Sequence, residues 1–98
     1  MSHLINFYGL ECPHCENMEP LIGELENQTG LRVDRLEIWH NKDNAAKMQE
    51  CDKDGECGGV PFFINTKTGK TLCGEASYDE LLDWAGVDEA ALASDSDR

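Results

Sequence analysis

Two spacings of apolar residues alternate along the chain and predict its secondary structure. Residues 4–8 form a short apolar and aromatic run, which predicts a buried strand. From Pro13 to Thr29 apolar side chains recur three and four positions apart, so we expect a helix whose buried face is made of Met18, Leu21, Ile22 and Leu25. Pro13 suits the first turn of this helix, Gly30 suits its end, and Pro20 should kink its interior.

The same two spacings continue through the second half of the chain. We expect strands at residues 31–39, 60–65 and 71–73, and helices at residues 41–51 and 78–85. The inward-facing residues of the first of these helices should be Ala45, Ala46 and Met48. A Ser-x-x-Glu capping box at Ser77 begins the last helix, and Gly86 ends it.

The predicted order of elements is β-α-β-α-β-β-α, which indicates an α/β domain with a four-stranded mixed sheet and flanking helices. The first strand, helix and strand imply a right-handed crossover and a parallel pair, and the last two strands form a hairpin across residues 66–70. We assign residues 1–92 to one domain and the small, polar residues 93–98 to a disordered acidic tail.

Composition and charge narrow the possible functions. Apolar residues make up 40% of the chain and are spread along it, so we expect a folded domain. There are 20 Asp and Glu against 8 Lys and Arg, which gives a formal net charge of −12. This charge argues against nucleic acid and anionic membrane as partners, since both require a cationic surface. No run of about 18 apolar residues exists that would span a membrane.

The N-terminus and the cysteine count bear on location. Residues 1–6 contain neither a basic segment nor a long apolar core, so we expect no secretory signal and predict a cytoplasmic protein. In a reducing compartment, an odd number of cysteines, here five, indicates redox or metal chemistry rather than a framework of structural disulfides. We expect a monomer with no bound cofactor or resident metal.

The candidate chemistry begins at Glu11-Cys12-Pro13-His14-Cys15, where the first strand gives way to the first helix. The positive end of the helix favours a thiolate on Cys12, and a protonated His14 would add to this effect. A thiolate is the nucleophile of thiol–disulfide exchange, and Cys15, one turn into the helix, is placed to attack a mixed disulfide on Cys12. We therefore expect Cys12 to be the more exposed thiol. Half of a zinc site and two unreactive buried thiols are the alternatives, which the position between strand and helix disfavours.

Several separate features resemble the thioredoxin superfamily in its minimal form, over residues 3–86. They are the redox pair Cys12 and Cys15, the helix-kinking Pro20, the cis-proline step Val60-Pro61, and Gly74, the glycine that lets a substrate approach the dithiol. The resemblance implies a thioredoxin-like fold and a thiol–disulfide oxidoreductase that serves electron transport and cell redox homeostasis.

The resemblance also implies roles for residues around the dithiol. Pro13-His14 is similar to the middle pair of the disulfide-forming periplasmic branch, in which the histidine stabilises the thiolate and makes the protein oxidising. That implication opposes the cytoplasmic location predicted above. A cis bond before Pro61 would expose the backbone of Val60, so that an extended substrate pairs with it.

One position departs from the thioredoxin pattern. Six residues before the first cysteine, thioredoxins carry a buried acid that takes the proton from the second thiol, and this chain has Asn6 there. An amide does not act as a base, so water, Glu37 or Glu11 serves instead, or deprotonation of Cys15 is slow.

The other cysteines allow several interpretations. Cys51 and Cys57 flank a polar loop that leads to Pro61. A second dithiol, a relay to a partner, a pair of zinc ligands and solvated bystanders have about equal weight for these two residues. Cys73 lies on a predicted strand and is expected to be a small core residue. Because they lack partners at metal-ligand spacing, two histidines are expected to be plain surface residues, His3 and His40.

Three functions compete. The leading hypothesis is a cytoplasmic oxidoreductase in which Cys12 attacks a protein disulfide, Cys15 resolves the mixed disulfide, and a separate reductant recharges the pair. The second is a glutaredoxin-like protein that uses glutathione, and the acidic neighbours and the single Gly74 in place of a Gly-Gly step argue against it. The third is a metal-binding or redox-sensing module whose zinc ligands are Cys12, Cys15, Cys51 and Cys57.

Overall fold

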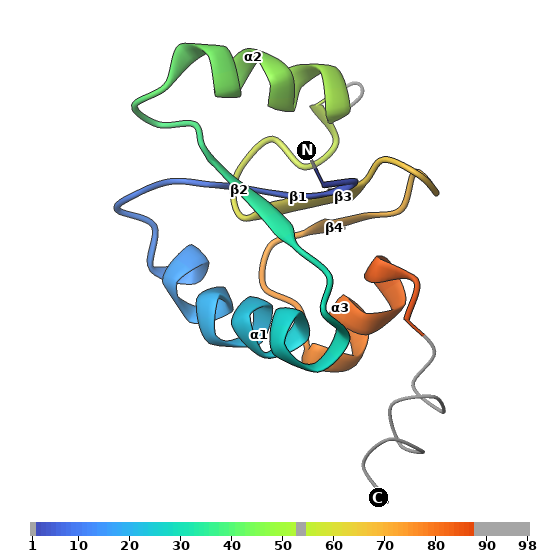
Figure 1. Ribbon diagram of the computed structural model, residues 1–98. Helices are drawn as coiled ribbons and strands as arrows, with labels where there is room; N and C mark the ends of the chain where they lie inside the picture. The colour runs from blue at the N-terminus through green and yellow to red at the C-terminus, as the bar shows by residue number, and fades with distance from the viewer. Residues whose placement is uncertain (1, 53–54, 88–98) are drawn as a thin grey trace, which may run out of the picture.

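The computed structural model describes residues 2–52 and 55–87, and the elements follow the predicted order. The strands are β1 (Leu4–Tyr8), β2 (Val33–Glu37), β3 (Phe62–Asn65) and β4 (Thr71–Cys73), and the helices are α1 (Pro13–Thr29), α2 (Lys42–Cys51) and α3 (Tyr78–Ala85). Figure 1 shows α2 on one face of the sheet and α1 with α3 on the other. The predicted α/β architecture is confirmed. The predicted tail at residues 93–98 lies outside the described residues.

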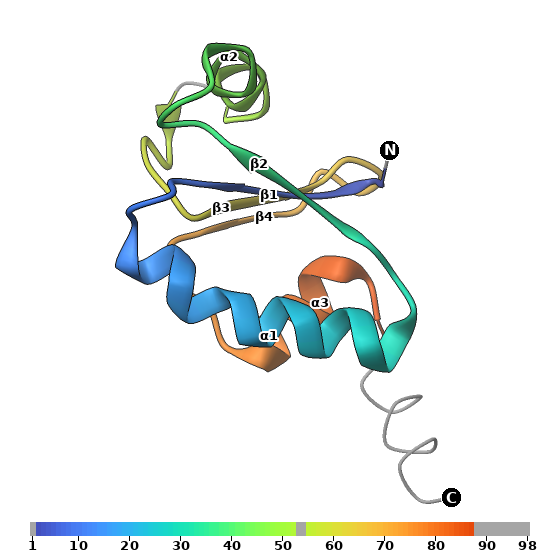
Figure 2. The same cartoon turned by 60° about the vertical axis from the view of Figure 1, so that its left-hand side comes forward.

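The four strands form one mixed sheet in the order β2-β1-β3-β4. β1 runs parallel to β2 and antiparallel to β3, and β3 and β4 are antiparallel neighbours. The hairpin register sets Phe62 opposite Cys73. The predicted parallel pair and hairpin are therefore both present. The turned view of Figure 2 shows α1 running along the sheet beside α3.

Two hydrophobic clusters hold the layers together, one on each face of the sheet. Alternate residues of β1 point to opposite faces, so Leu4 joins the cluster under α1 and α3, whereas Ile5 and Phe7 join the cluster under α2. The first cluster is completed by buried residues of β2, β3 and both helices, namely Met18, Ile22, Leu25, Val33, Phe63, Leu81, Leu82, Trp84 and Ala85. The larger of the two cores thus anchors α1, the helix that carries the dithiol.

The buried face of α2 is narrower than predicted. Met48 is buried and Ala45 is half-buried, but Ala46 is exposed, so its predicted inward position is wrong. Residues three apart share a helix face, whereas residues two apart do not, and Ala46 lies only two positions before Met48.

The helix ends follow the predicted capping residues. α1 ends at Gly30, whose φ of 76° lies in the left-handed region, and Ser77 with Glu80 forms the predicted capping box of α3. β2 is shorter than predicted because Glu37 turns the chain: its carboxylate accepts the backbone N–H groups of Trp39 and His40 at 3.1 and 2.7 Å.

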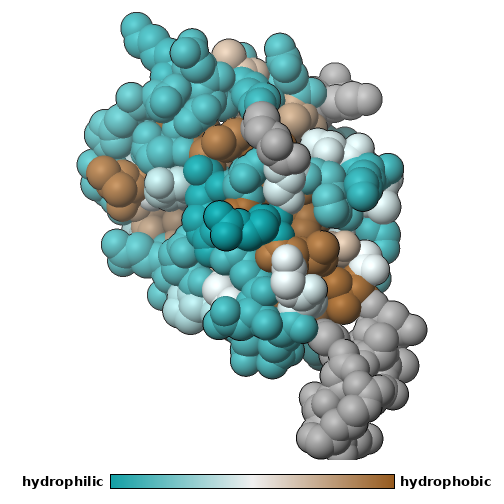
Figure 3. All heavy atoms as spheres, viewed as in Figure 1, coloured by the Kyte–Doolittle hydropathy of each residue, from teal (hydrophilic) through white to brown (hydrophobic). Residues whose placement is uncertain are grey.

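The surface agrees with the acidic composition. The face in Figure 3 is mostly hydrophilic, with apolar patches between the polar groups. Across residues 2–52 and 55–87, no helix combines the length and the apolar character needed to cross a bilayer.

Candidate functional site

The dithiol lies where β1 leads into α1. Cys12 caps the N-terminus of α1, and its Sγ accepts the backbone N–H of Cys15 at 3.3 Å. The backbone N–H of Cys12 donates to the carbonyl of Gly9 at 3.1 Å, which closes the turn between strand and helix. Unpaired N–H groups at a helix N-terminus carry partial positive charge, so Cys12 Sγ lies at the positive end of α1.

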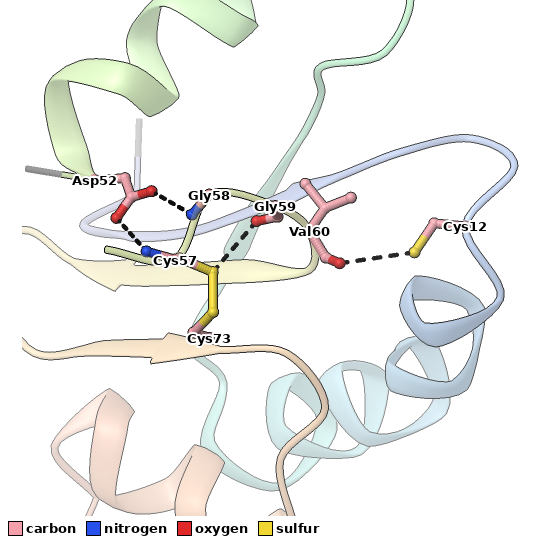
Figure 4. Close-up of a disulfide and its surroundings, with 7 residues drawn as sticks. All are labelled: Cys12, Asp52, Cys57, Gly58, Gly59, Val60 and Cys73. Atoms are coloured by element: carbon pink, nitrogen blue, oxygen red, sulfur yellow. Dashed lines mark hydrogen bonds between the residues drawn. A yellow bond between two sulfur atoms is a disulfide. The ribbon is translucent and has the colours of Figure 1, made fainter. Parts of the chain in front are cut away.

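Both cysteines of the motif are free thiols and both are buried, at 4% exposure each. The prediction that Cys12 is the more exposed thiol is therefore wrong. The segment before β3 lies against Cys12, because the carbonyl oxygen of Val60 is 3.9 Å from Cys12 Sγ (Figure 4). A partner that reaches Cys12 therefore also meets the Val60 backbone.

The chemical environment of Cys15 suppresses its ionisation. Burial, followed by the hydrogen bond with Cys12, raises the pKa of the Cys15 thiol to about 12. At neutral pH Cys15 is therefore a protonated thiol. The two sulfurs are chemically distinct: Cys12 receives a helix N–H, whereas Cys15 is held as a thiol until its proton is removed.

His14 has a partner that the sequence did not reveal. Its Nδ1 pairs with the carboxylate of Glu75, which also accepts a hydrogen bond from Asn17 Nδ2 at 3.4 Å. The hydrogen bond from His14, aided by that from Asn17, lowers the pKa of Glu75. The motif therefore has an acidic neighbour, Glu75, that its own residues do not show.

Glu11 and His40 form a second exposed ion pair beside the motif, with His40 Nε2 at 2.8 Å from the Glu11 carboxylate. The hydrogen bond with Glu11 raises the pKa of His40. His40 is a surface residue, as predicted, and it also pairs with Glu11. The partners are 29 positions apart, so no local pattern joins them.

Neither carboxylate proposed as a base for Cys15 is bonded to it among the described residues. Glu11 is paired with His40, and Glu37 accepts backbone N–H groups, including that of Leu10 at 2.9 Å. Desolvation acts to raise the pKa of Glu37, but its three N–H donors together lower it. Both carboxylates are thus bonded to partners other than Cys15.

Asn6, at the position of the thioredoxin acid, is fully buried on β1. Its amide nitrogen and amide oxygen have no hydrogen-bond partner within the described part of the chain. A buried polar group without a partner is costly, by about 1–3 kcal/mol. The amide at this position supplies no base.

The Val60–Pro61 peptide bond is cis, the geometry that the resemblance implied. Pro61 is buried, and its carbonyl accepts the backbone N–H of Gly74 at 2.8 Å. Gly74 has a φ of 84°, a conformation that glycine adopts readily. The fold thus links Gly74 to Pro61 and brings Val60 beside Cys12.

Two exposed apolar side chains lie beside the turn that leads from β1 to Cys12. Leu10 is 61% exposed and Trp39 is 51% exposed, and they are the large hydrophobic side chains exposed among the described residues. The Trp39 ring lies on Gly9, where an added Cβ would be only 2.3 Å from the ring. The turn before Cys12 is thus bordered by exposed apolar surface.

Two of the remaining three cysteines form a disulfide that the sequence analysis did not predict. Cys57 forms a disulfide with Cys73, and Cys51 is free. Cys73 is exposed rather than a core residue, so that prediction is wrong. The pairing depends on the hairpin, whose register sets Cys73 opposite Phe62 at the start of β3.

The zinc hypothesis loses its ligand set, because Cys57 is occupied by the disulfide. Over residues 2–52 and 55–87, no three His, Cys, Asp or Glu side chains come together as a metal site would require.

Comparison with known proteins supports the fold. No protein-family model matches the chain, and no curated protein sequence matches it. Among solved structures it is similar to the glutaredoxin (grx-1) from Archaeoglobus fulgidus, with a TM-score of 0.64 and 14% sequence identity over 86% of each chain. The chain therefore has the thioredoxin-like fold that its motifs predicted.

Proposed function

We propose that this protein is a thiol–disulfide oxidoreductase that exchanges disulfides with protein substrates through Cys12 and Cys15. The observation that carries the proposal is the position of Cys12 Sγ at the N-terminus of α1, where it accepts the Cys15 N–H at 3.3 Å. A sulfur at a helix N-terminus, with a second cysteine one turn later, is suited to attack a disulfide and then to be released.

In the proposed reaction the Cys12 thiolate attacks one sulfur of a substrate disulfide. A Cys12–substrate disulfide forms, and the other substrate sulfur leaves as a thiolate that takes a proton from water. Cys15 then loses its proton to water, and its thiolate attacks Cys12 Sγ, which releases the second substrate sulfur as a thiolate that takes a proton from water. The substrate has gained two electrons, the protein holds a Cys12–Cys15 disulfide, and an external dithiol reductant restores the pair.

Proton removal from Cys15 is the demanding step. Burial raises the pKa of Cys15 to about 12, and among the described residues no carboxylate is bonded to it. We propose water as the proton acceptor. Because burial is the largest cause of the shift, part of the shift persists when Cys12 is bonded to a substrate and no longer acts on Cys15.

The substrate contacts follow from the groups around Cys12. The Val60 backbone offers an edge to an extended segment, and Leu10 and Trp39 offer apolar surface. The net charge of −12 favours substrates that carry positive charge. The cytoplasm and a monomeric state stay our predictions.

A glutathione-dependent reaction is the second candidate, since the fold is similar to that of a glutaredoxin. Carboxylates near the dithiol oppose it, because Glu11 and Glu75 flank the motif and glutathione is an anion.

The test is reduction of insulin disulfides by three single variants. Cys12→Ser should abolish turnover, Cys15→Ser should accumulate a mixed disulfide, and Cys51→Ser, the matched control at the other free cysteine, should retain turnover. Turnover by Cys12→Ser at the rate of the unmodified protein would refute the proposal. Replacing the external dithiol reductant with glutathione in the same assay separates the two candidates.

A further inference from the structure

The Cys57–Cys73 disulfide joins the loop that follows α2 to the last residue of β4. Cys73 is exposed and Cys57 is half-buried, so the bond is within reach of molecules in solution. Exchange requires that an attacking thiolate reach a sulfur of the disulfide, and exposed disulfides are the ones that open most readily.

The loop on the Cys57 side is held by one buried carboxylate. Asp52 accepts the backbone N–H groups of Cys57 and Gly58, each at 2.9 Å (Figure 4). Cys57 Sγ lies 3.3 Å from the carbonyl oxygen of Gly59. In the disulfide this sulfur bears no proton, so the approach is only a contact. After reduction the thiol would be able to donate a hydrogen bond to the same oxygen.

The same loop leads directly to the dithiol. Val60 follows Cys57 by three positions, and its carbonyl oxygen is 3.9 Å from Cys12 Sγ. Figure 4 shows this path from the disulfide, through Gly58 and Gly59, to Val60 and Cys12. The disulfide therefore fixes one end of the segment that faces the proposed nucleophile, and the two Asp52 hydrogen bonds provide a second anchor.

A cavity of about 600 Å³ lies beside the disulfide. It is bounded by the two disulfide-bonded residues Cys57 and Cys73, by the free Cys51, and by the acidic side chains of Asp52 and Glu56. This volume is within the range of small-molecule sites. Negative charge at its wall opposes entry of an anionic thiol and favours a neutral or cationic one.

We propose that the Cys57–Cys73 disulfide is a second redox site, opened by a neutral or cationic low-molecular-weight thiol, and that its opening loosens the Gly58–Val60 segment that faces Cys12. The thiolate attacks the exposed Cys73 sulfur, forms a mixed disulfide there, and displaces the Cys57 thiolate, which takes a proton from water. A second thiolate attacks the mixed disulfide and releases the Cys73 thiolate, which is also protonated. Two thiols have become one disulfide, and the protein has gained two electrons.

Cys51 provides the matched control, because it lines the same cavity without taking part in the bond. Burial, and then the nearby Glu50 charge, raise the pKa of Cys51, so at neutral pH it is a poor attacking group. The external thiol is therefore the attacking species.

The opening step is tested in a Cys12→Ser/Cys15→Ser protein, which lacks the dithiol and is independent of the proposed function. The folded protein is incubated with cysteamine, 2-mercaptoethanol or 2-mercaptoethanesulfonate at equal thiolate concentration, and newly formed thiols are alkylated and located by mass spectrometry. We expect both Cys57 and Cys73 to be labelled, fastest with cationic cysteamine and slowest with the anionic sulfonate. Adding Glu56→Gln should narrow this order, and adding Cys51→Ala should leave it unchanged.

The proposal is overturned if Cys57 and Cys73 stay unlabelled until denaturant is added, since the disulfide is then purely structural. It is also overturned if the three thiols react at the same rate, because the acidic cavity is then not the route of entry.

The effect on the segment rests on the proposed function and is tested with the dithiol intact. In Cys57→Ala/Cys73→Ala the KM for insulin should rise several-fold, while exchange with the small disulfide 5,5′-dithiobis(2-nitrobenzoate) should continue at the rate of a Cys51→Ala control. The two Asp52 hydrogen bonds persist, so we expect weaker substrate binding and retention of the fold. An unchanged KM would refute the loosening. If the Cys51→Ala control exchanges with neither insulin nor 5,5′-dithiobis(2-nitrobenzoate), the proposed function is refuted instead.

Discussion

The segment from Gly58 to Val60 runs from one cysteine pair to the other, and the two pairs differ in exposure, in spacing and in redox state. Cys12 and Cys15 are thiols, each 4% exposed, and stand three positions apart at a helix N-terminus. Cys57 and Cys73 are bonded, 16 positions apart, and join a loop to a strand that leaves Cys73 exposed.

The difference separates two routes to reactivity. In the first pair, the N-terminus of α1 and the Cys15 N–H act on the charge of the Cys12 sulfur. The segment before β3 covers this sulfur and limits access to it. In the second pair access is open, and reaction waits for an external thiolate. The first pair is therefore suited to start an exchange and the second to respond to one.

The largest expected effect concerns the pH dependence of the first pair. With a Cys15 pKa of about 12, the thiolate fraction rises about tenfold per pH unit at neutral and moderately alkaline pH. We expect the release of 2-nitro-5-thiobenzoate from a Cys12 mixed disulfide to accelerate about tenfold per pH unit, or about a hundredfold from pH 7 to pH 9, as followed by stopped-flow absorbance. A plateau in this range would mean that burial does not hold Cys15 as a thiol, and would remove the contrast between the two sulfurs of the pair.

A smaller effect is expected from supplying the missing acid. Asn6→Asp places a carboxyl in a fully buried site, where desolvation raises its pKa. If this group takes the Cys15 proton, release at pH 7 should accelerate by about tenfold, less than the ~10²–10⁴-fold typical of a general base because the raised pKa leaves the carboxyl partly protonated. The same stopped-flow assay measures it.

The control for this substitution is Asn65→Asp on the adjacent strand β3. Asn65 is also buried, but its amide donates to the Trp84 carbonyl at 2.9 Å. Asn65→Asp should lower stability, measured by urea unfolding, without accelerating release. Equal acceleration in both variants would show a general loosening of the core rather than a base at position 6.

The sequence was informative where the decisive interactions are local. The helix over residues 13–29, its capping glycine and the Ser77 capping box depend on residues within one or two turns, and each was predicted with its boundaries. The dithiol was found for the same reason, since a three-residue spacing at a helix start needs no knowledge of the sheet.

The features that escaped prediction depend on sheet register and loop packing. The Cys57–Cys73 disulfide follows from the β3–β4 hairpin, and the equal burial of Cys12 and Cys15 follows from the approach of Val60 across 48 positions. The partner of His14 is 61 positions away at Glu75. None of these pairs produces a periodic pattern in the sequence.

The smallest expected effect comes from the exposed His14–Glu75 pair. At pH 6, His14→Tyr removes positive charge, so the Cys12 thiolate is less stable and the reduction potential should fall. Glu75→Gln removes the compensating carboxylate, and the potential should rise. Solvent screens exposed ion pairs, so both shifts should be smaller than the two effects above. Redox titration in glutathione buffers measures both, and shifts of the same sign would contradict this account of the pair.

The central claim is that Cys12 is the sulfur that meets a substrate disulfide. The most direct measurement is to react Cys15→Ser, with Cys57–Cys73 intact, with an excess of a disulfide-bonded peptide and to locate the mixed disulfide by peptide mass spectrometry. We predict that the peptide is attached at Cys12. Attachment at Cys51 with Cys12 left unmodified would contradict the account.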